Sequence, residues 1–163
     1  MKTTTLQEVL RERPLLRYAS LPQDQAARLA HQDFVSGQDH IGFLPNEALM
    51  DNYVCKMYAT DFFRRAVEFT PELITPSLIN DFERIFTECN AASRLNIVTI
   101  LGLLKYNSSS RFLEAVITSP EKNGGSLMLI QAANEALLIF HGHLEIGSNN
   151  LLFGRQIYWL YPR

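Results

Sequence analysis

The chain has 163 residues, of which 47% are hydrophobic and 20% are charged. These proportions are typical of a soluble globular protein, and a domain of this length buries enough surface to fold without disulfide or metal cross-links. The 15 basic and 17 acidic residues give a net charge of −2 and form no basic stripe, which argues against a nucleic-acid partner. We therefore expect a single domain over residues 1–163.

The amino terminus, the hydropathy and the cysteines together predict a cytoplasmic protein. No long apolar stretch follows Lys2, so the first residues do not resemble a signal peptide. No run reaches the roughly 18 uncharged apolar residues of a membrane span, so no membrane partner is expected. Cys55 and Cys89 each lie inside an apolar helical pattern, and we interpret both as reduced core thiols.

Helix signals dominate the first half of the chain. Residues 5–8, Thr-Leu-Gln-Glu, form a capping box. A helix is predicted after Ser20, because Ala26, Ala30 and Phe34 fall at helical spacing before Gly37. After a loop with two glycines over residues 36–45, a further helix is expected to continue as far as Phe69.

The second half continues the helical pattern until Gly142. Thr75 caps an amphipathic helix that begins at Pro76, and Ser93 is expected to cap the next helix, which is apolar on nearly every side. A short helix follows, and Ser126 is expected to cap the last one. Beyond Gly142 the pattern leaves open a short hairpin or an irregular tail. These signals predict an all-α fold, an irregular right-handed array or bundle of about seven to eight helices.

Residues 93–104, Ser-Arg-Leu-Asn-Ile-Val-Thr-Ile-Leu-Gly-Leu-Leu, resemble the second helix of a HEAT repeat. That family favours an early Arg, small apolar residues at the centre and a Leu-Gly-x-Leu close, represented here by Arg94 and Gly102. The segment from Leu127 to Phe140 is similar and lies about 36 residues further on, but it lacks both the Arg and the Gly. The resemblance covers residues 76–141 and implies a helical-repeat scaffold, to which an irregular helical bundle is the alternative.

This resemblance implies that the protein acts by binding a partner on its surface, since helical arrays bind along faces that neighbouring helices share. The predicted binding face is a neutral polar stripe on two neighbouring helices: Asn96, Thr99 and Tyr106 beside Gln131, Asn134 and Glu135. Some compact HEAT-like modules serve as bacterial immunity proteins, so the resemblance implies a cytoplasmic inhibitor that blocks a toxin domain by occlusion. Acidic side chains that would face a basic toxin are Glu72, Asp81, Glu83 and Glu88. A solvated helix face is the alternative explanation for all of these residues.

Motifs for catalysis, cofactors and metals are absent from the sequence. It contains no Gly-x-Ser-x-Gly, no His-Glu-x-x-His and no paired-cysteine metal pattern. His141 and His143 have only Glu145 nearby as a third ligand, so we interpret them as histidines at a helix end. Residues 123–126, Asn-Gly-Gly-Ser, lack the Lys of a phosphate-binding loop. We therefore predict a non-enzymatic protein-binding module without cofactor or metal.

Two other classes of function remain open. One is an enzyme with an unrecognised helical-bundle site, for which the available residues are His31, Asp33, Asp39 and His40. The other is a structural or regulatory adaptor, which an exposed patch at residues 158–161 would favour. The identity of the partner, the binding face and the oligomeric state do not follow from the sequence.

Overall fold

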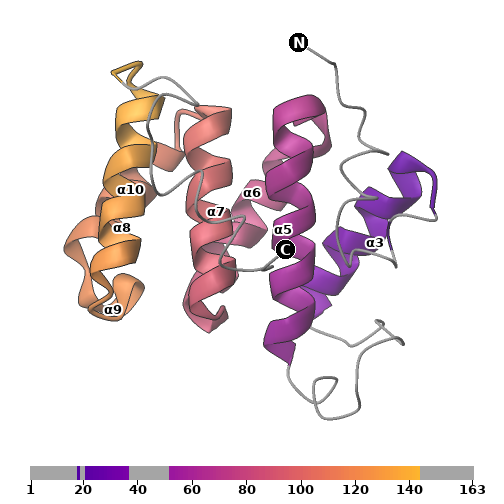
Figure 1. Ribbon diagram of the computed structural model, residues 1–163, viewed down its shortest axis with the longest axis horizontal. Helices are drawn as coiled ribbons and strands as arrows, with labels where there is room; N and C mark the ends of the chain where they lie inside the picture. Colours follow the sequence, from indigo (N-terminus) through magenta and orange to yellow (C-terminus); the bar gives the residue numbers. More distant parts are fainter. Residues whose placement is uncertain (1–17, 19–20, 37–51, 144–163) are drawn as a thin grey trace, which may run out of the picture. The chain divides into compact units, whose positions relative to one another are not determined.

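The computed structural model describes residues 18, 21–36 and 52–143. These residues form seven α-helices and two short 3-10 helices, and no strand occurs among them (Figure 1). The predicted all-α class is confirmed. Within the described part of the chain, no helix combines the length and the apolar character that crossing a bilayer requires. The predictions for residues 5–8 and for the segment after His143 lie outside the described residues.

Residue contacts divide the chain into two compact units, Met1–Asp81 and Phe82–Arg163. The boundary between them falls within helix α6, Pro76–Ile85. Each unit contains buried apolar residues of its own. That the whole chain behaves as a single domain therefore stays a prediction.

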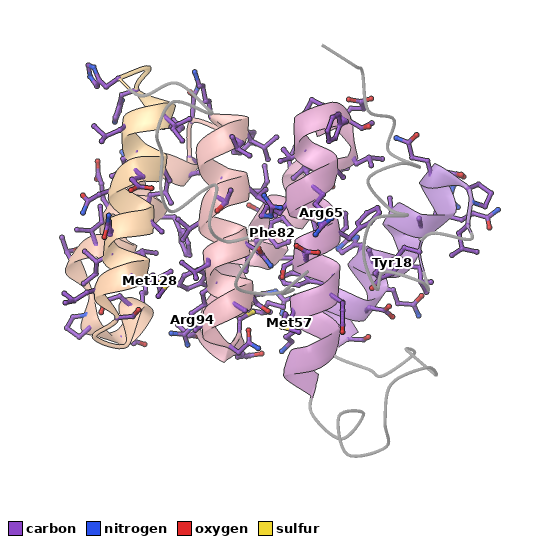
Figure 2. All side chains as sticks on the ribbon, viewed as in Figure 1. Tyr18, Met57, Arg65, Phe82, Arg94 and Met128 are labelled. Carbon is purple, nitrogen blue, oxygen red and sulfur yellow. The ribbon has the colours of Figure 1, made fainter. Side chains whose placement is uncertain are left out.

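The core of the first unit lies between α3, Gln23–Ser36, and α5, Asn52–Phe69. Ala26, Ala30 and Phe34 of α3 are completely buried, as their spacing predicts. The ring of Tyr18 packs on Phe62 of α5 with the ring centroids 5.3 Å apart (Figure 2). The helix predicted after Ser20 is thus confirmed together with its inward face.

A 3-10 helix, η1 (Pro71–Leu73), leads from α5 to α6, whose start is confirmed. The Thr75 hydroxyl accepts a hydrogen bond from the Leu78 amide at 3.2 Å, and Pro76 occupies the first helical position. The apolar face of α6 is buried, and it includes Leu78, Ile79, Phe82 and Ile85. A second 3-10 helix, η2 (Phe86–Glu88), follows directly. Just after it, the buried Cys89 is a reduced thiol that donates to the Ile85 carbonyl, as predicted, whereas the side chain of Cys55 is not described.

The second unit contains α7 (Ala91–Leu104), α8 (Ser109–Thr118), α9 (Pro120–Asn123) and α10 (Leu127–Phe140). α10 packs against both α7 and α8 (Figure 1). Ser126 caps α10 as predicted, since its hydroxyl accepts from the Leu129 amide at 3.2 Å.

The predicted cap of α7 is wrong. Asn90 occupies that position, and its side-chain oxygen accepts from the Ser93 amide at 2.9 Å. Asn caps a helix as well as Ser does, and the two alanines that follow it favour the helical conformation. The helix therefore begins earlier than predicted, and Ser93 lies buried in its first turn.

Gly102 brings α7 very close to α10. A Cβ atom at Gly102 would lie 2.8 Å from the Cβ and 2.9 Å from the Cα of Ala136. Real side chains do not tolerate such distances, so only glycine permits this crossing. Three alanines give α10 a matching face of small buried residues: Ala132, Ala133 and Ala136.

Arg94 joins two connecting segments of the second unit at the start of α7 (Figure 2). Its guanidinium donates to the carbonyls of Phe86, Thr87 and Lys122 at 3.1, 2.6 and 3.2 Å. It also lies over the Phe86 ring, 5.6 Å from the centroid. One planar side chain thereby donates to carbonyls of both η2 and α9.

Candidate functional site

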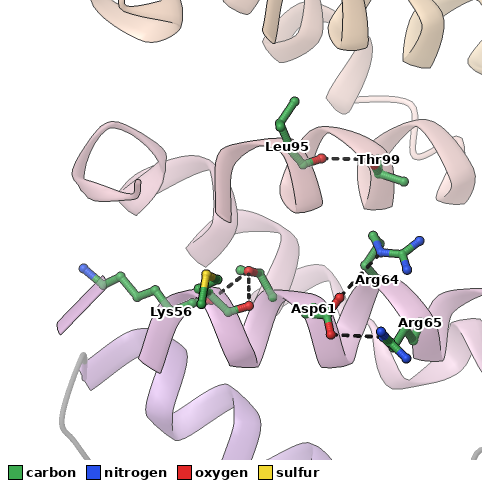
Figure 3. Close-up of polar contacts among 8 residues, drawn as sticks. Lys56, Asp61, Arg64, Arg65, Leu95 and Thr99 are labelled. Carbon is green, nitrogen blue, oxygen red and sulfur yellow. Dashed lines mark hydrogen bonds and ion pairs between the residues drawn. The ribbon is translucent and has the colours of Figure 1, made fainter. Parts of the chain in front are cut away.

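The predicted polar stripe is only partly on the surface. Asn96 and Thr99 of α7 are buried, so they are not surface contacts as predicted. The Thr99 hydroxyl donates to the Leu95 carbonyl of its own helix at 2.8 Å, which lets this side chain be buried at little cost (Figure 3). A polar residue type in an apolar helix therefore gave a misleading signal of exposure.

The other four residues of the predicted stripe remain accessible. Tyr106 lies just after α7 and is exposed, as are Gln131 and Asn134 on α10. Glu135 is half-buried, and burial raises the pKa of its carboxyl above the ordinary value while a hydrogen bond from Gln131 opposes that shift. The accessible part of the predicted face thus lies mainly on α10.

The exposed side of α10 also carries large apolar side chains that the sequence did not single out. Leu127 is 80% exposed and Leu138 is 44% exposed. They lie on one line along the helix with Gln131 and Asn134, because the four positions are spaced i, i+4, i+7 and i+11. We call Leu127, Gln131, Asn134 and Leu138 the α10 outer face. Met128, 43% exposed, lies beside it (Figure 2).

The α10 outer face has an equivalent line of positions on α7, and one of those positions, Gly102, contacts α10. The two helices have 14 residues each and begin 36 residues apart, at Ala91 and Leu127. Leu138 therefore occupies the position of Gly102, which contacts Ala136 of α10. In the described part of the chain no helix follows α10 to cover its equivalent face. The 36-residue spacing between α7 and α10 is the sequence signal from which the exposure of Leu127 and Leu138 could have been predicted.

The four predicted acidic residues do not form one cluster within either unit. Glu72 in η1 is exposed, and the Asp81 carboxylate on α6 lies 2.8 Å from His31 Nε2. Glu88 in η2 is exposed. Glu83 is half-buried, and burial raises the pKa of its carboxyl, an effect that the Lys122 ammonium opposes. Glu72 and Glu88 are therefore the two that present accessible carboxylates.

A cleft of about 240 Å³ in the first unit contains His31. Its apolar floor includes Phe63 and Leu78, and its rim includes charged side chains. Among the charged groups at the rim, Arg28 lies 3.7 Å from Asp24 and His31 lies beside Asp81, whereas Glu72 is exposed. Thr75, the hydroxyl of the cleft, accepts from the α6 backbone.

The residues of the predicted enzyme site are not brought together in this cleft. Asp33 is fully buried, where it accepts a hydrogen bond from the Tyr18 hydroxyl at 2.9 Å. It follows His31 by two residues on α3, so the two side chains leave the helix in different directions. Asp39 and His40 lie outside the described residues. The described groups therefore form two separate hydrogen bonds, His31 with Asp81 and Tyr18 with Asp33, and do not converge on one point.

Helix α5 carries a buried charged cluster that the sequence analysis missed. The Asp61 carboxylate lies 3.0 Å from Arg65 Nε and 3.9 Å from Arg64 Nε, and all three side chains are buried (Figure 3). The spacing of three and four residues places these groups on adjacent turns of one helix. Because the cluster is buried, it offers no surface to a partner.

The remaining candidate motifs are the Asn123 loop and the histidine pair after α10. Asn123 donates to the Val116 carbonyl at 2.9 Å and accepts from the Gly125 amide at 2.8 Å, so this loop uses its polar groups internally. His141 and His143 are exposed, with ring centroids 6.4 Å apart. Across the described ranges, no group of three His, Cys, Asp or Glu side chains could hold a metal ion.

Comparisons with family models, with curated proteins and with solved structures find no significant match to this chain. The resemblance of residues 76–141 to HEAT repeats therefore rests on their own pattern. The α10 outer face is the candidate site that combines exposure, apolar area and regular spacing.

Proposed function

We propose that this protein is a non-enzymatic protein-binding module that acts through the α10 outer face. The observation that carries the proposal is the exposure of Leu127 and Leu138 on one line of a regular helix. Exposed leucines lose contact with water when a partner covers them, and burial of apolar area is the main favourable term in protein association. A face kept only for solubility would carry charges in these positions.

The two polar residues of the face support the same function. Gln131 and Asn134 lie between the leucines and carry no charge, so covering them requires hydrogen bonds and no desolvation of ions. A neutral amide offers both donors and acceptors to a partner. This combination suits a protein surface better than a nucleic acid, whose phosphates would require Lys or Arg.

The narrower proposal is an immunity or antitoxin type of inhibitor that blocks a partner by covering it. It rests on the HEAT-like pattern of α7 and on the lack of convergent catalytic groups among the described residues. The partner would be a toxin domain with a basic surface near the exposed Glu72 or Glu88. A cytoplasmic location is part of this proposal.

The test is a capture experiment with the tagged full chain in three forms, the wild type and two variants. We expect the wild-type chain to retain a stoichiometric protein partner and the Leu138→Glu variant to lose it, because a carboxylate in the centre of an apolar contact is costly to desolvate. Val35→Glu is the control, since Val35 is an exposed apolar residue on α3, 39% accessible. Equal retention of the partner by wild type and Leu138→Glu would contradict the proposed face.

A further inference from the structure

The α10 outer face has a two-fold pattern along its own length. Leu127 and Leu138 are equally far from the midpoint between Ala132 and Ala133, and so are Gln131 and Asn134. We propose that this face pairs with the same face of a second copy, with the two α10 helices antiparallel about a two-fold axis that passes between them at the level of that midpoint. The inference rests on the proposed function, because it assigns a partner to the same surface.

The pairing places leucine against leucine and amide against amide. In an antiparallel pair, Leu127 of each copy lies opposite Leu138 of the other, and Gln131 lies opposite Asn134 of the other. Each amide has a donor group and an acceptor group, so the central pair can exchange hydrogen bonds. None of the four residues of the face is charged, and the neighbouring Glu135 carboxyl is half-buried and accepts a hydrogen bond from Gln131. An isologous contact of this kind closes on itself and forms a dimer.

A second copy fits this face better than a further helix packed as α10 packs on α7. That packing depends on Gly102, which lets Ala136 approach to a distance at which no side chain fits. Leu138 occupies the equivalent position on α10 and holds a partner helix further away. Contact positions spaced alternately by four and three residues are the pattern by which helices pair at the wider separation of about 8–10 Å. The four positions of the α10 outer face follow this spacing, with leucines at the two ends and amides between them, and the same face of a second copy matches it.

The area of the face indicates a weak dimer. A helix of 14 residues is about 21 Å long at 1.5 Å per residue. One face of such a helix offers well below the roughly 800 Å² per partner of a stable interface. We therefore expect monomers at about 1 µM and dimers approaching 1 mM. Because a heterologous partner would use the same leucines, it would compete with the second copy.

The experiment measures the molar mass of the full chain by sedimentation equilibrium between about 1 µM and 1 mM, the range set by the expected affinity. The expected result for wild type is a rise from 18.6 kDa towards twice that mass. Leu127→Lys and Leu138→Glu should each stay monomeric across the range. Val35→Glu, the matched exposed control, should dimerise like wild type. Far-ultraviolet circular dichroism verifies that every variant keeps its helices.

The double variant Leu127→Lys with Leu138→Glu tests the orientation. Antiparallel pairing puts each Lys opposite a Glu of the other copy, so dimerisation should return at low salt and weaken at high salt. Parallel pairing would put Lys opposite Lys, and the double variant would stay monomeric. A monomeric double variant, or a Leu138→Glu variant that still dimerises, overturns the proposal.

The outcomes separate this inference from the proposed function. A wild-type chain that stays monomeric at about 1 mM overturns self-pairing, even where Leu138→Glu loses a captured protein and the proposed function stands. A monomeric wild type whose Tm falls by several degrees in Leu138→Glu shows that the chain's own residues cover the face, which also overturns self-pairing. Dimerisation through α10 with no effect of Leu138→Glu on a captured partner supports the inference and contradicts the proposed use of the face.

Discussion

Helices α7 and α10 are equal in length and similar in apolar character, yet they are buried to different extents. α7 buries eight of its 14 residues, including the polar Ser93, Asn96 and Thr99, whereas α10 buries five, all apolar. Both helices would be assigned to a core from their composition. The difference teaches that apolar composition alone does not fix burial, because a helix face is buried only where a neighbouring element packs on it.

Two pairs of equivalent residues account for much of this difference. Arg94 of α7 corresponds to Ile130 of α10, and Gly102 corresponds to Leu138. The α7 member of each pair holds another segment in place, by hydrogen bonds from Arg94 and by close approach at Gly102. The α10 members do neither, so the predictions below compare the two helices at these positions.

The largest effect is expected from Arg94→Ala. Loss of three hydrogen bonds from a charged donor should lower the free energy of unfolding by about 2–4 kcal/mol, because the Phe86, Thr87 and Lys122 carbonyls lose a partner. Ile130→Ala, at the equivalent half-buried position, should cost about 1 kcal/mol. Urea denaturation of both variants measures the two values. Equal losses would mean that Arg94 contributes no more than packing.

The second prediction concerns the close approach of α7 and α10. In an exposed helix, Gly to Ala stabilises by about 1 kcal/mol. At Gly102 the added methyl would meet Ala136, so Gly102→Ala should destabilise by about 1–3 kcal/mol instead. Adding Ala136→Gly should recover part of that loss, which a double-mutant cycle in urea would detect. Additive effects of the two changes would contradict the contact.

A smaller effect is expected from the pH dependence of Glu135. Burial raises the pKa of its carboxyl in the folded chain. The folded state therefore holds a proton that the unfolded state has already lost, and the stability falls as the pH rises from the ordinary value of 4.5 through the raised pKa. Glu135→Gln should remove this fall, a change below about 1 kcal/mol because solvent screens the half-buried group. Denaturation at pH 4 and pH 7 tests the difference, and parallel curves for both forms would contradict it.

The smallest effect on stability is expected from Leu138→Glu. An exposed helix position tolerates a polar residue within about 0.5 kcal/mol, so the Tm should barely change while association through α10 is lost. The same Glu at Gly102, where Ala136 leaves no room, should prevent normal packing. The Tm of the two variants compares the outer face of α10 with the inner face of α7 directly.

Much of the fold could be predicted because its signals are local. The Thr75 and Ser126 caps and the buried face of α3 follow from side chains within a few residues of one another. The cap of α7 could not be predicted in this way, since Asn90 and Ser93 are both good capping residues and only one of them can occupy the N-cap position. The buried cluster around Asp61 was missed because charged residues are ordinarily exposed.

The candidate site was predicted in part. Gln131 and Asn134 were assigned correctly to an accessible face, but their leucine neighbours were not singled out, because exposed and buried leucines look alike in a sequence. Asn96 and Thr99 were assigned to the surface and are buried. Residue type gives only the average preference for burial. The two exposed leucines, Leu127 and Leu138, and the two buried polar residues, Asn96 and Thr99, depart from that average.

The sequence alone determined that this is an all-α protein and where several of its helices begin, because capping and helical periodicity act within a few residues. Only the tertiary structure decided that α7 is buried on most sides and that α10 leaves Leu127 and Leu138 in solvent. The physical reason is that burial depends on a neighbouring element, and an apolar side chain has the same identity whether or not that neighbour is there. The face that we propose for binding therefore became visible only when the helices were placed beside one another.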